Sequence, residues 1–319
     1  MSNTYTFIIA EHILKLTFAM TEQNGIDLLP SFAAFNIKEA DDGCILYGQD
    51  DKCNRKATTE PLTTITVDDS LTPAKENETT RIDTFDTGNG DTIVDSTSEG
   101  YQFILKDIKG RSCCLLKTNA DFTHAACALK GNIGMRRFGL NNAIMMVYAF
   151  RASFFDTLLI HASLVRNNGY GYAFIAKSGT GKSTHTALWL KHIDGTDLMN
   201  DDNPIIRIID GKPYIYGSPW SGKTPCYRNT KAKLGAITKI DRAKANSIER
   251  LSPTLAFVQV LPSCSTMRWD KTIYSNTYNT VIKLIETIPS VNILHCLPDE
   301  EAARICYKAI TVKQDARSL

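Results

Sequence analysis

Apolar and polar residues alternate in short segments over the first 130 residues of the chain. Segments rich in β-branched and aromatic residues lie at 5–16, 43–48, 63–67, 81–85, 101–106 and 112–117. Turn sequences at 88–91 (Gly-Asn-Gly-Asp) and 108–111 (Ile-Lys-Gly-Arg) predict hairpins, and the acidic stretch 68–78 is expected to be a loop. The pattern predicts a mostly antiparallel, β-rich N-terminal domain over residues 1–133.

Near residue 134 the apolar residues begin to recur at helical spacing. Phe138, Leu140, Ile144, Met145 and Tyr148 follow this spacing in a stretch without proline. We expect a helix of about four turns that opens the second domain, residues 134–319. Its methionines are interpreted as core-filling residues.

From residue 157 onward, strand-like and helix-like segments follow one another. Strands are expected at 158–165, 170–176 and 197–199, helices at 182–192 and 299–310, a hairpin at 204–217, and mixed αβ stretches at 251–261 and 277–295. Turns are expected at Asn168-Gly169 and Asp210-Gly211. This predicts an α/β second domain, and an α+β protein overall.

Length and charge refine this picture. A chain of 319 residues is about twice the usual domain size, so two domains are expected. Residues 1–130 contain 12 Lys+Arg and 20 Asp+Glu, which gives a net charge of −8. Residues 131–319 contain 24 Lys+Arg and 14 Asp+Glu, which gives a net charge of +10. The second part should attract anions. Nucleic acid would be the alternative anionic partner. No run of Lys and Arg reaches the five to eight residues typical of a nucleic-acid-binding patch, so nucleic-acid binding is not expected.

The nine cysteines are scattered, and no Cys-x-x-Cys pair occurs. Zinc ribbons and disulfide scaffolds are therefore not expected, whereas reduced thiols favour a cytoplasmic location. The sequence shows neither a signal-peptide pattern at its start nor an apolar run of 18 residues. We expect no membrane partner.

A glycine-rich segment carries the most specific chemistry. Residues 176–183 read Ala-Lys-Ser-Gly-Thr-Gly-Lys-Ser, between a predicted strand and a predicted helix, which is the context of a phosphate-binding P-loop. Lys182 would reach the β- and γ-phosphates of ATP, and the Ser183 hydroxyl would ligate Mg²⁺. Ala176 replaces the first glycine of the full pattern, and a chance glycine-rich turn is the alternative. The candidate nucleotide-binding residues are Ser178, Gly179, Thr180, Gly181, Lys182, Ser183 and Thr184.

Two adjacent carboxylates follow the P-loop helix. Asp201 and Asp202 are expected at the end of a strand beside the P-loop strand, where open α/β sheets bind ligands. Neighbouring side chains in a strand point in opposite directions, so one carboxylate would hold Mg²⁺ and the other would accept a proton. A solvated turn before Asn203-Pro204 is the alternative. His161 is either a core histidine or a partner of these carboxylates.

Residues 218–228 are rich in hydrogen-bond donors. Lys223 and Arg228 are expected to neutralise a transferred phosphoryl group, and Trp220 is expected to wall the acceptor pocket. An exposed turn with a stray lysine is the alternative. Arg268-Trp269 is a weaker candidate of the same kind.

Three motifs resemble, in order and spacing, the catalytic domain of HPr kinase/phosphorylases, a phosphoenolpyruvate carboxykinase-like P-loop family. They are Ile-His-Ala-Ser-Leu-Val (160–165), the glycine-rich segment 176–183 and Asn-Asp-Asp (200–202). The close resemblance covers residues 157–209. It implies a Mg-ATP-dependent kinase in which His161 supports Asp201 as the base, with Asp202 and Ser183 at the metal. Thr230 and Ala232 stand where the family has Glu and Arg, so HPr is not the expected acceptor.

The sequence therefore predicts a kinase that transfers the γ-phosphoryl group of ATP, with Mg²⁺, to a hydroxyl group. The acceptor is either a small metabolite such as free serine, as in divergent relatives of that family, or a protein serine. An ATP-binding sensor or pseudokinase that acts through the N-terminal domain is the first alternative, and a carboxykinase-type lyase is the second. Both aspartates are present, which favours catalysis. The oligomeric state stays open, a homo-oligomer included.

Overall fold

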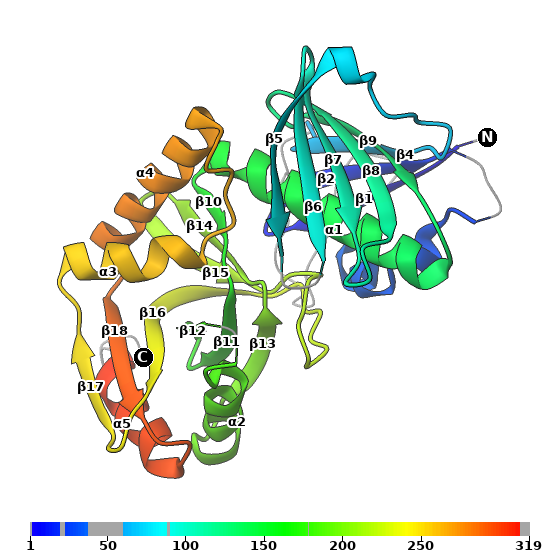
Figure 1. Cartoon of the computed structure of the whole chain (residues 1–319). Coiled ribbons are helices and arrows are strands. Elements are labelled where there is room, and N and C mark those ends of the chain that lie inside the picture. Colours follow the sequence, from blue (N-terminus) through cyan, green and yellow to red (C-terminus); the bar gives the residue numbers. More distant parts are fainter. Residues whose placement is uncertain (1, 20–22, 38–59, 88–89, 178, 313–319) are drawn as a thin grey trace. The chain divides into compact units, whose positions relative to one another are not determined.

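The computed structural model describes residues 2–19, 23–37, 60–87, 90–177 and 179–312. The chain divides into two compact units, Met1–Ala152 and Ser153–Leu319, each described by itself (Figure 1). Large sheets and several helices make the protein a mixed α+β structure. Among the helices in the described ranges, none has the length and apolar content needed to cross a membrane.

One large sheet dominates the first unit. Its strands are β1 (Asn3–Ile9), β2 (His12–Phe18), β3 (Asn36–Ile37), β4 (Thr63–Val67), β5 (Thr79–Asp86), β6 (Asp91–Thr97), β7 (Gly100–Lys106), β8 (Ser112–Asn119) and β9 (His124–Leu129). Their order is β3-β1-β2-β4-β9-β8-β7-β6-β5. Among the described strand pairs of this first sheet, only β2–β4 and β4–β9 are parallel, which confirms the mostly antiparallel expectation. The predicted strand 43–48 lies outside the described residues.

The sequence pattern predicted one β segment over residues 5–16, whereas the structure has a hairpin of β1 and β2 there. Its turn residues Ala10 and Glu11 have φ of 47° and 64°, in the left-handed region that tight hairpin turns need. Alanine and glutamate are not typical of such a turn, so the sequence pattern did not predict it. Three short 3₁₀ helices, η1 (Ile26–Leu28), η2 (Pro30–Phe35) and η3 (Glu76–Glu78), complete the described part of this unit together with the helix α1.

The helix α1 (Ile133–Ala152) belongs to the first unit, and this corrects the predicted domain boundary at 133/134. Leu140, Ile144 and Val147 on its apolar face are fully buried. A Cβ added at Gly139 would lie 2.8 Å from the backbone oxygen of Cys113 in β8, so glycine permits close contact with the sheet. Helical spacing predicted the buried face but not which sheet it covers.

The second unit contains a mixed sheet with the order β10-β14-β15-β16-β12-β11-β13, and β18 extends it beside β16. Its strands are β10 (Thr157–Leu159), β11 (Ala162–Asn167), β12 (Tyr170–Ile175), β13 (Asp197–Asp202), β14 (Ile205–Ile209), β15 (Lys212–Tyr216), β16 (Lys231–Arg242), β17 (Ser247–Arg250) and β18 (Ser290–Cys296). The helices are η4 (Ser153–Phe155), α2 (Lys182–His192), α3 (Pro253–Val260), η5 (Leu261–Ser263), α4 (Lys271–Thr287) and α5 (Glu300–Ile310). The predicted hairpins at 168–169 and 210–211 and the helix 182–192 are confirmed.

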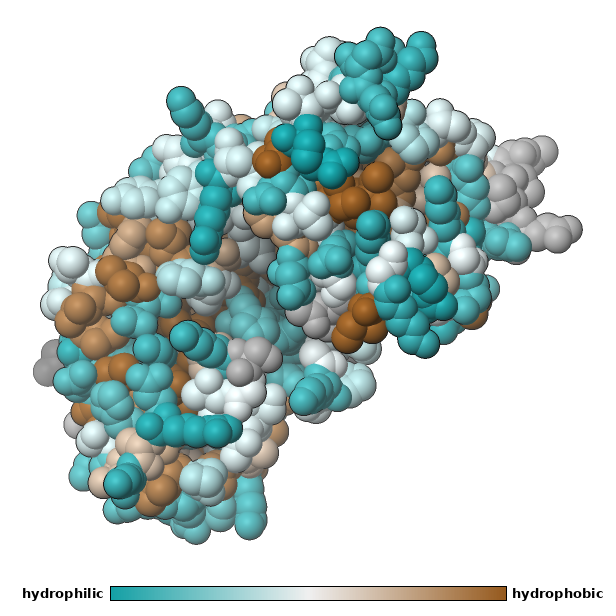
Figure 2. All heavy atoms as spheres, in the orientation of Figure 1, coloured by the Kyte–Doolittle hydropathy of each residue, from teal (hydrophilic) through white to brown (hydrophobic). Residues whose placement is uncertain are grey.

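Helices cover both faces of this sheet (Figure 1). In β12, Tyr172 and Phe174 pack with residues of α2 and α5, whereas Ala173 and Ile175 face the core shared with α3 and α4. The alternation along one strand therefore separates two hydrophobic cores. The outer surface of α3 and α4 also exposes apolar side chains, seen in brown in Figure 2, among them Leu255 and Val258.

We expect Gly139→Ala to destabilise the first unit by about 1–3 kcal/mol, because overpacking against the β8 backbone outweighs the higher helix propensity of alanine. Gly134→Ala in the same helix is the matched control. Its Cβ would meet only Asn132 Oδ1, at 3.4 Å, so it should be neutral or stabilise by up to about 1 kcal/mol.

Urea unfolding followed by far-UV circular dichroism measures this effect. All three tryptophans, at 189, 220 and 269, lie in the second unit, so their fluorescence monitors that unit separately. A Gly139→Ala protein with unchanged dichroism transitions would contradict the packing described for α1.

His185 of α2 provides a pH-dependent contribution to stability in the second unit. It is 2% exposed, its Nε2 accepts a hydrogen bond from Trp189 Nε1 (3.0 Å), and its ring packs edge-on against Phe174. Burial lowers the pKa of His185 from 6.5 to about 4. The unfolded chain binds the proton more readily, so this stability is complete above pH 6.5 and is lost as the pH falls towards 4.

We expect wild type to lose up to about 3 kcal/mol more than His185→Gln between pH 7 and pH 4, because glutamine accepts the tryptophan hydrogen bond but does not titrate. Urea unfolding followed by tryptophan fluorescence at a series of pH values measures the difference. Parallel pH profiles for the two proteins would show that His185 is not held neutral in the folded state.

Candidate functional site

The carboxyl ends of β12 and β13 meet at one edge of the second sheet (Figure 1). β11 lies between them and pairs antiparallel with both, with Ser163 opposite Phe174 of β12 and Asp201 of β13. The glycine-rich loop follows β12, and Asp201 and Asp202 end β13. The aspartates thus reach the expected edge, although one strand separates them from the loop's own strand.

The glycine-rich loop has an open backbone conformation at the start of α2. Gly179 and Gly181 have φ of 76° and 129°, values that glycine adopts without strain. A Cβ at either position would meet no atom within 4 Å, so free space lies beside both residues. A helix N-terminus next to such space fits a phosphate group. Ser178 lies outside the described residues, and Thr180 and Thr184 lie in the loop and in the first turn of α2.

Three side chains form a hydrogen-bonded chain at this edge. Lys182 Nζ lies 2.7 Å from His161 Nε2, and His161 Nδ1 lies 2.9 Å from Asp202 Oδ1. An ammonium group only donates, so Nε2 accepts and the Nδ1 proton is directed at Asp202. Burial would raise the pKa of Asp202, but the hydrogen bond from His161 and the nearby charge of Lys182 outweigh it and hold the pKa below its usual value.

Asp202 and Lys182 are also constrained. Asp202 has a φ of 113°, which a non-glycine residue rarely adopts, and such strain is typical of functional sites. Burial lowers the pKa of Lys182, while the nearby carboxylates of Asp202 and Asp201 oppose that effect. Lys182 is held in place by the histidine and by the carbonyl of Ala176 at 3.3 Å.

Asp201 has different surroundings from its neighbour. It is 4% exposed, and Oδ1 accepts a hydrogen bond from Ser163 Oγ (2.7 Å) and lies 3.5 Å from Ser183 Oγ. Oδ2 accepts from the Thr224 backbone N–H at 3.2 Å. The expected pairing of His161 with Asp201 is therefore corrected, because His161 contacts Asp202. Strand alternation separates the two carboxylates, and it leaves Asp201 beside Ser183.

The 218–228 segment reaches the site only in part. The loop at 221–224 closes on Asp201: Gly222 N donates to the backbone oxygen of Asp201 at 2.5 Å, and Lys223 stands exposed between Gly222 and Thr224. Trp220 is 2% exposed, so very little of its surface is available to line an acceptor pocket.

Arg228, by contrast, is not brought to this edge. It pairs with Asp197 at the opposite end of β13, at 2.6 Å, and Arg166 pairs with the same carboxylate. Four residues of strand, about 13 Å, separate that end from Asp201. Burial would raise the pKa of Asp197, but hydrogen bonds from Arg166 and Arg228 hold it lower. Arg228 therefore stabilises the far end of the sheet, and its expected contact with a phosphoryl group is not supported.

Sequence reasoning missed Arg242, the last residue of β16. Its Nε donates to the carbonyl of Thr180 (2.9 Å) and its Nη2 to that of Gly179 (2.6 Å). β16 is the parallel neighbour of β12, so both strands end at the same edge. A basic residue at the end of a strand parallel to the P-loop strand was the signal that could have identified it.

No protein-family model matches the chain, and a search of curated proteins finds no match of significance. The site therefore has to be interpreted from its own geometry.

We expect Arg242→Met to speed amide exchange at Gly179–Gly181 by roughly 3–10-fold, because two hydrogen bonds to the loop are lost and exposed bonds of this kind contribute modestly. Lys244→Met, two residues further along, is the control and should leave the loop unchanged. Hydrogen exchange with mass spectrometry measures both. Equal exchange rates in wild type and Arg242→Met would show that the loop keeps its conformation without the Arg242 hydrogen bonds.

Proposed function

We propose that the second unit is an ATP-dependent kinase that transfers the γ-phosphoryl group to a hydroxyl acceptor, with Mg²⁺. The observation that carries the proposal is the hydrogen-bonded chain from Lys182 through His161 to Asp202 beside an open glycine loop. It combines a cation at a helix N-terminus with a histidine–carboxylate pair. The resemblance to the HPr kinase/phosphorylase family supports the same class, and a phosphoenolpyruvate carboxykinase-like fold is part of this proposal.

Accessibility favours the His161–Asp202 pair as the base. The side chains of His161 and Asp202 are 42% and 33% exposed, whereas Asp201 is almost fully buried. A base must come within hydrogen-bond reach of the acceptor hydroxyl. When Lys182 turns to the phosphates, His161 Nε2 becomes free to accept that proton, and Asp202 stabilises the imidazolium that forms.

Asp201 and Ser183 provide the metal side of the site. Their oxygens lie 3.5 Å apart, and Mg²⁺ usually takes one or two protein oxygens and completes its shell with phosphates and water. Both residues would hold the ion that accompanies ATP. Bound there, Mg²⁺ would neutralise charge on the β- and γ-phosphates. This division exchanges the roles first expected for the two aspartates.

The proposed reaction is a single displacement at the γ-phosphorus. The acceptor oxygen forms a bond to the γ-phosphorus, the bond from that phosphorus to the bridging oxygen breaks, and ADP leaves. The hydroxyl proton goes to His161. Lys182 and the exposed Lys223 would balance charge on the transferred group, and Arg242 would keep the loop in position.

We expect Lys182→Ala to weaken Mg-ATP binding by at least about 10-fold, because a charge-assisted contact to phosphate is lost. Lys177→Ala is the matched control, since this exposed lysine lies in the same loop and should change affinity by less than about threefold. Titration calorimetry compares the variants. Equal affinity for Lys182→Ala and wild type would mean that the loop does not bind phosphates.

We expect His161→Asn to retain Mg-ATP binding while turnover falls by ~10²-fold or more, because the amide still donates to Asp202 but cannot take the proton. His192→Asn in α2 is the control and should keep full turnover. Transfer of label from γ-labelled ATP to the components of a metabolite extract is the measurement. Wild-type protein that binds ATP but labels no compound or protein would favour the ATP-binding sensor instead.

A further inference from the structure

A buried polar anchor lies beneath the turn that carries Asp202, and the proposed reaction gives it no role. It consists of Asn200 in β13 and Ser218 in the loop after β15, and both residues are 0% exposed. Buried side chains of this kind do not touch a nucleotide or an acceptor. We propose that Asn200 and Ser218 are positioning residues, which hold Asp202 in its strained conformation with its carboxylate on His161. The inference rests on the proposed function for its effect on turnover, and on the structure alone for the position of Asp202.

The anchor fixes the backbone on the C-terminal side of Asp202. Asn200 Oδ1 accepts a hydrogen bond from the Asn203 N–H at 2.9 Å, and Ser218 Oγ donates to the Asn203 carbonyl at 2.6 Å. The residue that follows Asp202 is therefore bound at both of its backbone polar groups. The peptide plane between Asp202 and Asn203 cannot rotate without breaking the bond to Asn200.

The loop at 221–224 fixes the backbone on the N-terminal side. The Asp201 carbonyl accepts hydrogen bonds from Gly222 N at 2.5 Å and from Ser221 Oγ at 2.9 Å. A Cβ added at Gly222 would lie 3.0 Å from Asp202 Cβ, so this loop also packs directly against the Asp202 side chain. Both peptide planes that flank Asp202 are held, which explains how a φ of 113° persists at a residue other than glycine.

The amide group of Asn200 connects the turn to the loop. Its Nδ2 lies 3.0 Å from the Trp220 carbonyl oxygen and 3.2 Å from Ser218 Oγ, while its Oδ1 binds Asn203. One planar group thus supplies a donor to the loop and an acceptor to the turn. Alanine at position 200 would supply neither, and the turn and the loop would lose their buried connection.

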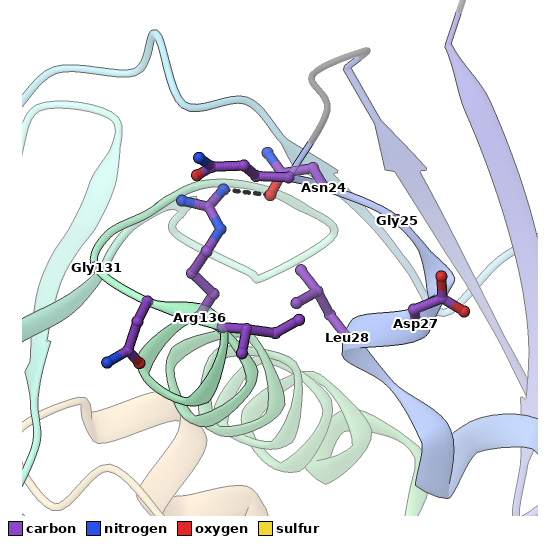
Figure 3. A pocket seen from close by; sticks show the side chains of 9 residues that line it. Asn24, Gly25, Asp27, Leu28, Gly131 and Arg136 are labelled. Carbon is purple, nitrogen blue, oxygen red and sulfur yellow. Dashed lines mark hydrogen bonds between the residues drawn. The ribbon is translucent and has the colours of Figure 1, made fainter.

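The first unit contains a buried polar anchor that serves as a contrast. Beside a pocket of about 460 Å³, Arg136 is 5% exposed and contacts Asn24 and the carbonyl of Leu129 (Figure 3). These contacts join α1 to the chain near residue 24 and to the end of β9, so they stabilise the unit. The Asn200 anchor differs, because the turn that it holds carries the carboxylate on His161.

Proton NMR of the full chain at low temperature tests the position of Asp202 without requiring any activity. A histidine Nδ1 proton bound to a carboxylate resonates downfield of the backbone amides, and its loss in His161→Asn assigns the signal. We expect wild type to show this resonance. Asn200→Ala and Ser218→Ala should lose it or shift it upfield, because the carboxylate moves away from Nδ1.

Asn292→Ala is the matched control. Asn292 is 4% exposed and lies in β18 of the same sheet, where its amide donates to Ser290 Oγ. This variant also loses a buried asparagine, but it should keep the His161 resonance. Circular dichroism establishes that the variants fold, and Ser218→Ala, which removes one hydroxyl group, decides the question if Asn200→Ala does not fold. An unchanged resonance in the folded variants, its loss in Asn292→Ala, or its absence from wild type would overturn the positioning role.

Transfer of label from γ-labelled ATP to a metabolite extract tests the link to the proposed function separately. Asn200→Ala and Ser218→Ala should lower the rate at saturating ATP by about 10-fold or more and change the half-saturating ATP concentration by less than about threefold, because a displaced carboxylate slows the chemical step and leaves the phosphate loop intact. If the resonance responds as expected but wild type labels no acceptor, the positioning role stands and the kinase proposal fails. Variants that lose the resonance but keep the wild-type rate would show that the anchor does not serve catalysis.

Discussion

A buried carboxylate needs hydrogen-bond donors, and the edge of the second sheet that carries the glycine-rich loop supplies them to Asp201. β11 provides the Ser163 hydroxyl from the neighbouring strand, and the loop after β15 provides the Thr224 N–H. The backbone oxygen of Asp201 receives two more donors from that loop, Gly222 N and Ser221 Oγ. The side chain and the backbone of Asp201 therefore connect two strands and a loop, with Lys223 and Ser183 at the same edge.

The balance of charge at this edge explains why it suits a polyanion. In the free protein, Lys182 is shared between a histidine nitrogen and a backbone carbonyl, neither of which carries a negative charge in that arrangement. Burial disfavours the ammonium ion, so an incoming phosphate offers it a better partner than it has. The same exchange frees His161. In the proposed reaction, nucleotide binding and base activation would thus be coupled through one lysine.

The sequence predicted local features well and long-range ones poorly. The Asn168-Gly169 hairpin, the helix 182–192 and the sheet-edge position of Asp201 and Asp202 follow from residues close together in the chain, and the structure confirms them. The pairing of Arg228 with Asp197 and the sheet covered by α1 depend on tertiary packing, which local sequence patterns do not reveal. The partner of His161 depends on which face of β13 each aspartate occupies, and a one-residue shift in register exchanges the two. Arg242 is 63 residues from the carbonyl of Gly179, so no local pattern connects them.

The backbone of Asp202 has a consequence for how this protein tolerates change. With a φ of 113°, position 202 suits glycine better than any residue with a side chain. A random search for more stable variants would therefore be expected to return Asp202→Gly, which relieves the backbone and removes the carboxylate beside His161. Under the proposed function, stability and activity thus select opposite residues at this position, and selection for the reaction would maintain the aspartate.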